Sequence, residues 1–309
     1  MNPPNRPPFP EVLDSTIIAA FRSCPRKAQL EFLEHWKMKT PSVHLHAGAA
    51  YAKGLEVART AFFQEGRDEE TSIALGLKSL ITAYGDFQCP EDSAKSLERT
   101  AGAFEFYMTR YSMPQDAAHP IKLPSGRLGI EFSFAEPIDR VHPETENPLL
   151  YVGRMDMICT FADGIFGLDD KTTSSLGASW SRSWDLRSQF TGYCWGAARA
   201  GLPLQGFLVR GVSILKAKYD EQQALTYRPA WMIERWYSQL LRDIDRMIQS
   251  WESGVWDYSL DHACTEYGGC PFRQVCLSQN PQPWLEGSFE RRRWDPVLRE
   301  EFPVEGDAK

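Results

Sequence analysis

YVGRMDMICTFADGIFGLDDKTT, residues 151–173, is the stretch of sequence that decides the fold. Apolar residues flank Asp156 on both sides, and this composition predicts a buried strand. Asp163-Gly164 then predicts a hairpin turn into a second strand. The stretch therefore predicts two neighbouring strands of a sheet, with acidic residues on both.

The second strand ends on Asp169-Asp170-Lys171. Because side chains alternate between the two faces of a strand, we expect Asp169 and Lys171 to point one way and Asp170 the other. Asp156 lies on the neighbouring strand, so two carboxylates and an ammonium group converge at one edge of the sheet. Carboxylate oxygens are hard ligands that suit Mg²⁺ or Mn²⁺, and such an ion polarises a phosphate and activates water.

A third phrase follows in the predicted helix over residues 180–200, where Gln189 and Tyr193 are four residues apart. The ordered set of Gly-Arg-x-Asp, a turn, Asp-x-Lys-Thr and Gln-x-x-x-Tyr resembles the core of the PD-(D/E)XK nuclease superfamily. Within it, the helical phrase is similar to that of the RecB-like branch, which includes the CRISPR-associated RecB-like exonucleases. The resemblance runs from about residue 15 to residue 276.

This resemblance implies an α/β fold, with a restriction-endonuclease-like mixed β-sheet flanked by helices. It implies that Asp156, Asp169 and the backbone carbonyl of Asp170 hold Mg²⁺ or Mn²⁺. It further implies that Lys171 assists the attacking water. Gln189 and Tyr193 are then expected to hold the substrate backbone or a metal-bound water.

An alanine-rich helix over residues 44–63 departs from the family pattern. The family helix has the form Gly-x-x-x-His-x-x-Leu-Glu, and its histidine is a metal ligand, but here that position is Ala52. Glu56, one helical turn later, is the favoured replacement ligand. His46 and the absence of any ligand from this helix are the alternatives.

Seven cysteines, an odd number, favour a reduced compartment over a disulfide framework. Cys264, Cys270 and Cys276 are clustered, whereas Cys24 opens a helix near the start of the chain. The resemblance extends to these four residues and implies a 4Fe-4S cluster that closes the two ends of the domain, with a structural role. Zinc and free thiols are the alternatives.

Composition limits the possible functions. The chain has 309 residues, 42% of them hydrophobic, which is enough for a substantial core, and a net charge of −7, which is unusual for a DNA-binding protein. No stretch approaches the roughly 18 apolar residues of a membrane span. The proline-rich start lacks the apolar segment of a signal peptide, so we expect a cytoplasmic protein without membrane contact.

Three segments are predicted along the chain. Residues 1–125 form a helical region that carries the first cluster cysteine, residues 126–258 the nuclease core, and residues 259–309 the cysteine loop and a solvated tail. The leading hypothesis is a metal-dependent DNA exonuclease that acts on single strands or duplex ends, in recombination, repair or CRISPR adaptation. The alternatives are a catalytically weak relative that binds DNA or a protein partner, and a zinc-stapled structural protein.

Overall fold

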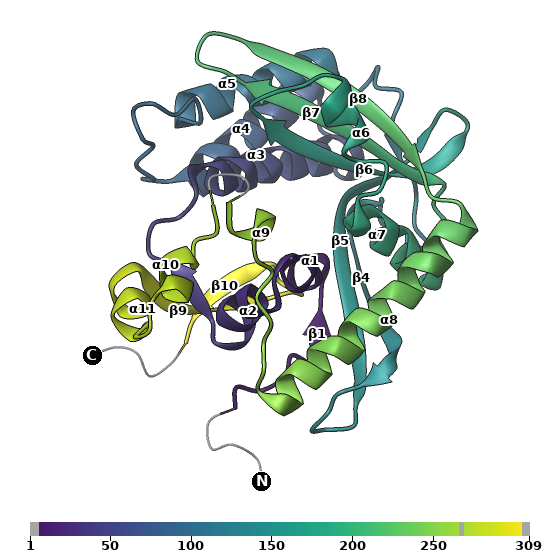
Figure 1. Ribbon diagram of the computed structural model, residues 1–309. Coiled ribbons are helices and arrows are strands. Elements are labelled where there is room, and N and C mark those ends of the chain that lie inside the picture. Colours follow the sequence, from purple (N-terminus) through teal and green to yellow (C-terminus); the bar gives the residue numbers. More distant parts are fainter. Residues whose placement is uncertain (1–5, 266–268, 305–309) are drawn as a thin grey trace. The chain divides into compact units, whose positions relative to one another are not determined.

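A computed structural model describes residues 6–265 and 269–304 of the chain (Figure 1). The chain divides into two compact units, each built from separate stretches of sequence. The first unit comprises 1–40, 134–153 and 234–309, and the second comprises 41–133 and 154–233. Gly268 of the predicted cysteine loop, the first five residues and the last five lie outside the described part. The predicted segment boundaries stay predictions.

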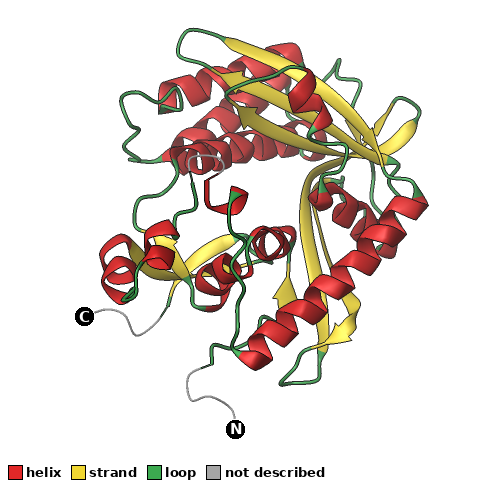
Figure 2. Ribbon diagram, viewed as in Figure 1, coloured by secondary structure: helices red, strands yellow, loops and turns green. Residues whose placement is uncertain are grey.

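The described residues form one mixed sheet of seven strands, in the order β1-β5-β6-β7-β8, with β3 and β4 also paired to β5. These strands are β1 (Val12–Leu13), β3 (His119–Pro120), β4 (Ile130–Val141), β5 (Pro148–Phe161), β6 (Gly164–Thr173), β7 (Gly206–Ile214) and β8 (Tyr219–Tyr227). β6 and β7 run parallel, whereas β5 pairs antiparallel with β6 and β8 pairs antiparallel with β7. Figure 2 shows helices flanking this sheet. The expected mixed α/β fold is therefore confirmed.

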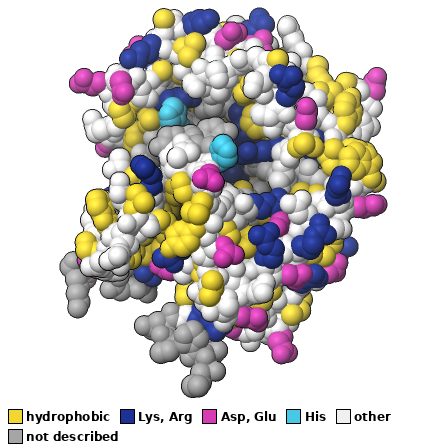
Figure 3. Space-filling model, viewed as in Figure 1, with side chains coloured by type: hydrophobic (Ala, Val, Ile, Leu, Met, Phe, Trp, Pro, Cys, Tyr) yellow, Lys and Arg dark blue, Asp and Glu magenta, His cyan; other side chains and the backbone are white. Residues whose placement is uncertain are grey.

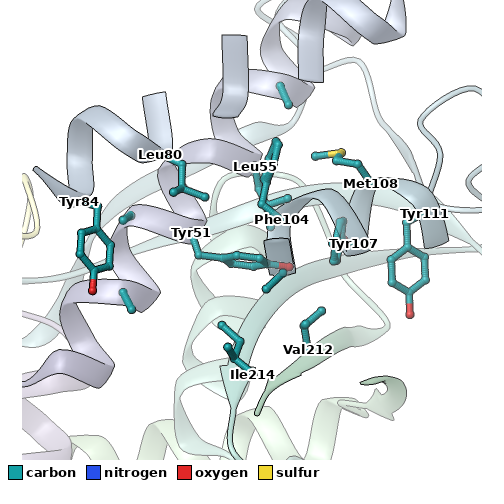
Figure 4. Packing of buried hydrophobic residues seen from close by; sticks show 14 of the residues in the cluster. Tyr51, Leu55, Leu80, Tyr84, Phe104, Tyr107, Met108, Tyr111, Val212 and Ile214 are labelled. Carbon is teal, nitrogen blue, oxygen red and sulfur yellow. The ribbon is translucent and has the colours of Figure 1, made fainter. Parts of the chain in front are cut away.

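In the second unit, helices cover both faces of the sheet. Its helical elements are α3 (Val43–Arg59), η2 (Thr60–Gln64, a π-helical turn), α4 (Glu69–Tyr84), α5 (Leu97–Arg110), α6 (Ala178–Arg182) and α7 (Ser188–Arg199). One face packs against α3, α4 and α5, where Tyr51, Leu80, Phe104 and Val212 share a buried cluster (Figure 4). On the other face, the ring of Phe190 from α7 stacks on Phe207 with centroids 4.5 Å apart.

The register between β6 and β7 assigns each side chain to one of these faces. Gly167 pairs with Phe207 and Lys171 pairs with Gly211, so the odd-numbered positions of β6 face α7. Asp170 and its partner Arg210 face α3 and α5 instead. The alternation predicted from the sequence for the acidic pair is therefore the alternation that the sheet has.

The first unit joins residues from both ends of the chain. Its helical elements are α1 (Ser15–Ser23), α2 (Pro25–Ala28), η1 (Gln29–Leu33, a π-helical turn), α9 (His262–Thr265), α10 (Arg273–Leu277), α11 (Gln282–Ser288) and most of α8 (Ala230–Ser253). A smaller sheet pairs β2 (Trp36–Met38) with β9 (Phe289–Asp295), which also pairs with β10 (Glu300–Pro303). Phe272 and Phe289 stack 4.7 Å apart beside buried Leu30.

Three local expectations are wrong. The tail does not stay solvated, because residues 289–303 pair as β9 and β10. The helix over 180–200 is two helices, α6 and α7, separated by a turn. The hairpin turn lies one residue earlier than predicted, at Ala162-Asp163, where both residues have positive φ and Gly164 already belongs to β6. Among the described residues, no helix combines the length and apolar character that crossing a bilayer needs.

Candidate functional site

The candidate site forms where the pairing of β5 with β6 ends. The last pair of the ladder joins Met157 to Leu168, and the next residues are Asp156 and Asp169. The backbone N–H of Asp170 donates a hydrogen bond of 2.8 Å to Oδ2 of Asp156. A carboxylate thus replaces a backbone acceptor at this point, and the two aspartates project from adjacent strands onto one face.

Asp169 and Lys171 form an ion pair on that face. The side chain of Asp169 is 4% exposed, whereas that of Lys171 is 31% exposed, so the lysine is the more exposed member of the pair. Burial lowers the pKa of Lys171, but the charges of Asp169 and Asp156 outweigh that effect and raise it above its usual value. Lys171 is therefore a cation at neutral pH.

Asp156 has an unusual protonation equilibrium. Burial raises its pKa to about 7, and the negative charges of Asp169 and Asp170 contribute to the rise. Two carboxylates share one ammonium group here, so negative charge exceeds positive charge at the site. A divalent cation would offset the excess.

The predicted pair on α7 makes the contact that its spacing allows. Nε2 of Gln189 donates a hydrogen bond of 3.0 Å to the hydroxyl of Tyr193. Tyr193 is 2% exposed, and its hydroxyl lies near enough to Lys171 to raise the pKa of that lysine. The structure thus brings Asp156, Asp169, Lys171 and Tyr193 together on the α7 face.

Asp170 points to the opposite face and enters a buried charge network. Its Oδ2 accepts a hydrogen bond of 2.6 Å from Nη1 of Arg59 at the end of α3. Arg59 also donates to the hydroxyl of Tyr107, which accepts a second bond from Arg210, and Arg210 binds Asp116 through two bonds of 2.6 Å. None of these partners belongs to a recognisable sequence motif. The sequence offers one signal for Arg59, which is its position at the end of a helix face that is otherwise apolar.

The candidate metal ligands on α3, Glu56 and His46, have other hydrogen-bond partners in the structure. Both carboxylate oxygens of Glu56 accept hydrogen bonds of 2.8 Å from Lys53. Nε2 of His46 lies 2.8 Å from the backbone carbonyl of Tyr84, and its ring stacks on Phe87. Helix α3 packs on the Asp170 face, so a role for Glu56 at the metal stays a prediction.

Within residues 6–265 and 269–304, no three His, Cys, Asp or Glu side chains are arranged to hold one metal ion. Asp156 and Asp169 still fit Mg²⁺, which usually keeps several waters and binds through one or two carboxylates plus substrate phosphate. The charge excess around Asp156 supports that fit.

Four cysteines of the first unit influence one another. Burial raises the pKa of Cys270, and the thiols of Cys24 and Cys264 raise it further. Burial likewise raises the pKa of Cys276, with added contributions from the other three thiols. That these four residues share one metal centre stays a prediction, and in the part of the chain that the structure describes no three His, Cys, Asp or Glu side chains are arranged to hold one metal ion.

The comparisons with known proteins agree with this geometry. The family model of the PD-(D/E)XK nuclease superfamily matches residues 15–277. The chain belongs to the PD-(D/E)XK nuclease superfamily. This membership confirms the superfamily predicted from the sequence and supports a hydrolytic nuclease activity; divalent metals such as Mg²⁺ are general in these nucleases. The RecB-like branch stays a prediction.

Solved structures add evidence on the fold. A crystal structure described as that of a candidate exonuclease from Eubacterium rectale has a TM-score of 0.51 and 13% identity, covering 87% of this chain and 94% of that chain. SSO0001 has a TM-score of 0.31 and 11% identity over 78% of this chain and 77% of that one, which is too low to support an inference. A search of curated proteins found no match.

We predict that Arg59→Met destabilises this nuclease by about 3–5 kcal/mol, because the substitution leaves the buried Asp170 carboxylate without its partner. Urea denaturation measures the loss in the free energy of unfolding.

The double variant Arg59→Met with Asp170→Asn should recover much of that loss, since no unpaired charge remains. Arg67→Met, in an exposed ion pair with Glu65, is the matched control and should change stability by less than about 1 kcal/mol. Equal losses in the two single arginine variants would contradict the prediction.

We also predict a pH-dependent effect of Asp156→Asn on the metal-free nuclease. The pKa of Asp156 is raised from 3.8 to about 7 on folding, so between these values the folded chain holds a proton that the unfolded chain releases. The wild type therefore loses stability relative to Asp156→Asn as pH rises from about 4 to about 7. Thermal melts in EDTA should therefore show the Tm of the wild type falling relative to the Tm of Asp156→Asn as the pH rises over this range. Asp163→Asn, at the exposed hairpin turn, is the control, and a constant gap for Asp156→Asn would refute the prediction.

Proposed function

We propose that this protein is a metal-dependent deoxyribonuclease that hydrolyses phosphodiester bonds as an exonuclease. The observation that carries the proposal is the convergence of Asp156, Asp169 and Lys171 where β5 and β6 separate. Superfamily membership supports the reaction class. The order and spacing of the three motifs support the RecB-like branch.

The residues of the site have distinct expected roles. Asp156, Asp169 and the backbone carbonyl of Asp170 would hold Mg²⁺ or Mn²⁺, with Glu56 as a candidate for a further ligand. When bound, such an ion polarises the scissile phosphate and lowers the pKa of a water. Lys171 is positively charged, so it orients the attacking water and offsets the negative charge that develops on the phosphate, rather than removing a proton. Gln189 and Tyr193, which are joined by a hydrogen bond, would hold the substrate backbone or a metal-bound water near Lys171.

The substrate class that we propose is single-stranded DNA or a duplex end. A net charge of −7 means that binding relies on local groups rather than on a basic surface as a whole. Figure 3 shows Lys and Arg side chains interspersed with Asp and Glu side chains on the visible face. We place the activity in recombination, repair or CRISPR adaptation, with proteins of those processes as partners, and in the cytoplasm.

We further propose a 4Fe-4S cluster held by Cys24, Cys264, Cys270 and Cys276. Cys264 and Cys270 are joined by a backbone hydrogen bond of 3.1 Å, and all four cysteines belong to the first unit, which supports a shared metal centre that would replace the thiol protons. Zinc is the alternative occupant, with ligand sulfurs about 2.3 Å from the ion, and the metal content of the purified protein separates the two. A larger inorganic core fits a wider set of thiols. Its role would be to fasten α2 to the loop that precedes α10.

A second candidate function comes from a different class. Ala52 stands where the family has its histidine ligand, and the described part of the chain lacks a three-ligand metal group. Both observations favour a catalytically weak relative that binds DNA or a protein partner. Metal-dependent cleavage separates the two candidates.

We predict that the purified chain degrades end-labelled DNA only when Mg²⁺ or Mn²⁺ is present. Lys171→Ala should lower the cleavage rate by about 100-fold or more, because it removes the cation beside the reacting phosphate. Assays on 5′- and 3′-labelled single strands and duplexes measure rate and polarity. Lys78→Ala, at an exposed position of α4, is the control and should cleave like the wild type. DNA binding without cleavage across a range of metal concentrations would favour the binding module.

We predict that anaerobically purified protein is brown, with absorbance at about 400 nm and about four iron atoms per chain. Cys270→Ser should remove most of this absorbance and lower the Tm, since one ligand of the centre is lost. Cys89→Ser is the matched control, because Cys89 belongs to the second unit and not to the four-cysteine group. A colourless protein with bound zinc, or with no metal, would refute the cluster.

A further inference from the structure

A row of three residues crosses the sheet beside the candidate site. Lys171 of β6 pairs with Gly211 of β7, and Gly211 pairs with Gln222 of β8. Residues in register on neighbouring strands point their side chains to the same face, so this row lies on the face that carries Asp169. Whatever covers Gly211 is therefore one strand spacing, about 4.8 Å, from the strand of Lys171.

The ring of Trp180 covers Gly211. A Cβ atom at position 211 would overlap the Cζ2 and Cη2 atoms of that ring, so only glycine lets the indole approach the sheet this closely. Trp180 belongs to α6, which lies between the lysine strand and the Gln189 helix in the sequence. An aromatic ring thus lies on the same face as the Asp169–Lys171 pair and next to it.

Several contacts fix the position of this ring. Oε1 of Gln222 accepts a hydrogen bond of 2.7 Å from the backbone N–H of Gly177, and its Nε2 donates to Oγ of Ser181, so one side chain holds both ends of α6. Gly177 has a φ of 122°, which only glycine adopts without strain. The ring of Trp184 packs edge-on against Trp180, 5.4 Å away. The indole is therefore held in place before any ligand binds.

The surroundings of the ring suit a nucleic-acid strand. Trp180 is only half-buried, whereas Arg182, Leu186 and Arg187 on the same segment are exposed. The guanidinium of Arg187 lies 5.9 Å from the centre of the Trp184 ring. Two exposed arginines thus lie near the half-buried ring, with Asp185 as the one exposed acidic side chain between them, and a cation beside an aromatic face is a combination that binds the phosphates and bases of single strands.

We propose that Trp180 is a stacking platform for an unpaired base next to the scissile phosphate. The proposal rests on the proposed nuclease function and specifies its substrate: a nucleotide whose base is free, at a single-stranded or frayed end. A base in a duplex is stacked between its neighbours and pays an unstacking cost before it reaches the ring. Selection for free bases therefore follows from the fixed ring beside Lys171, without contacts to base edges.

The experiment uses the Asp156→Asn variant, in which cleavage is blocked, and a single-stranded oligonucleotide with 2-aminopurine as its terminal base. Stacking on Trp180 should quench the probe. Adding Trp180→Ala should abolish the quenching and weaken single-strand binding about 5- to 100-fold. Trp180→Phe should retain most of both, whereas Trp180→Leu, which keeps apolar volume without an aromatic face, should resemble alanine. Trp231→Ala, at an exposed position of α8, is the control and should bind like its parent.

Two results would overturn the platform. One is the absence of quenching in the parent variant or its persistence in Trp180→Ala. The other is a leucine variant that binds and quenches like the parent, which would reduce Trp180 to a packing role. Cleavage by the wild-type chain is assayed separately. Quenching without any cleavage would refute the nuclease function but not the base-stacking site. Cleavage without quenching would refute the base-stacking site but not the nuclease function.

Discussion

The hydrogen bond from the backbone of Asp170 to the carboxylate of Asp156 is the interaction on which the rest of the site depends. It occurs where two antiparallel strands stop pairing, so it satisfies an amide that the ladder leaves without an acceptor. The same bond fixes one acidic side chain against the strand that bears the other. One contact thus coincides with the end of the strand pairing and holds the two acidic side chains on one face.

The opposite side of β6 supplies the rigidity. The side chain of Asp170 is held by Arg59, and Arg210 and Tyr107 continue the network between the sheet and α3 and α5. A buried arginine on each of two neighbouring elements makes this region costly to rearrange. Asp169 and Lys171 flank Asp170 on the same strand, so the ion pair of Asp170 with Arg59 on the opposite face also fixes their orientation. The reactive face can then carry an unbalanced charge without loosening the strand.

The sequence predicts the parts of this arrangement that follow local periodicity. Alternation along a strand is enough to separate Asp169 from Asp170, and helical spacing is enough to join Gln189 to Tyr193. The sequence does not predict the role of Arg59, because its partner Asp170 is distant in the sequence and a charged residue at a helix end is usually solvated. The tail was mistaken for solvated chain because its arginines suggest exposure, whereas strand pairing buries their backbone and leaves the charges outside. The sequence does not indicate a role for Trp180, because Gly211, which its ring covers, is distant in the sequence.

The pairing of β2 with β9 has a consequence for synthesis on the ribosome. β2 precedes β9 by about 250 residues, so the smaller sheet cannot close until residues 289–291 have been synthesised. The second unit, by contrast, is fully available once residue 233 has emerged. The residues of the second unit are therefore all present while Leu30 and Trp36 still lack Phe272, Val275, Leu285 and Phe289, with which they share a buried cluster. During that interval these side chains are exposed to chaperones and to aggregation.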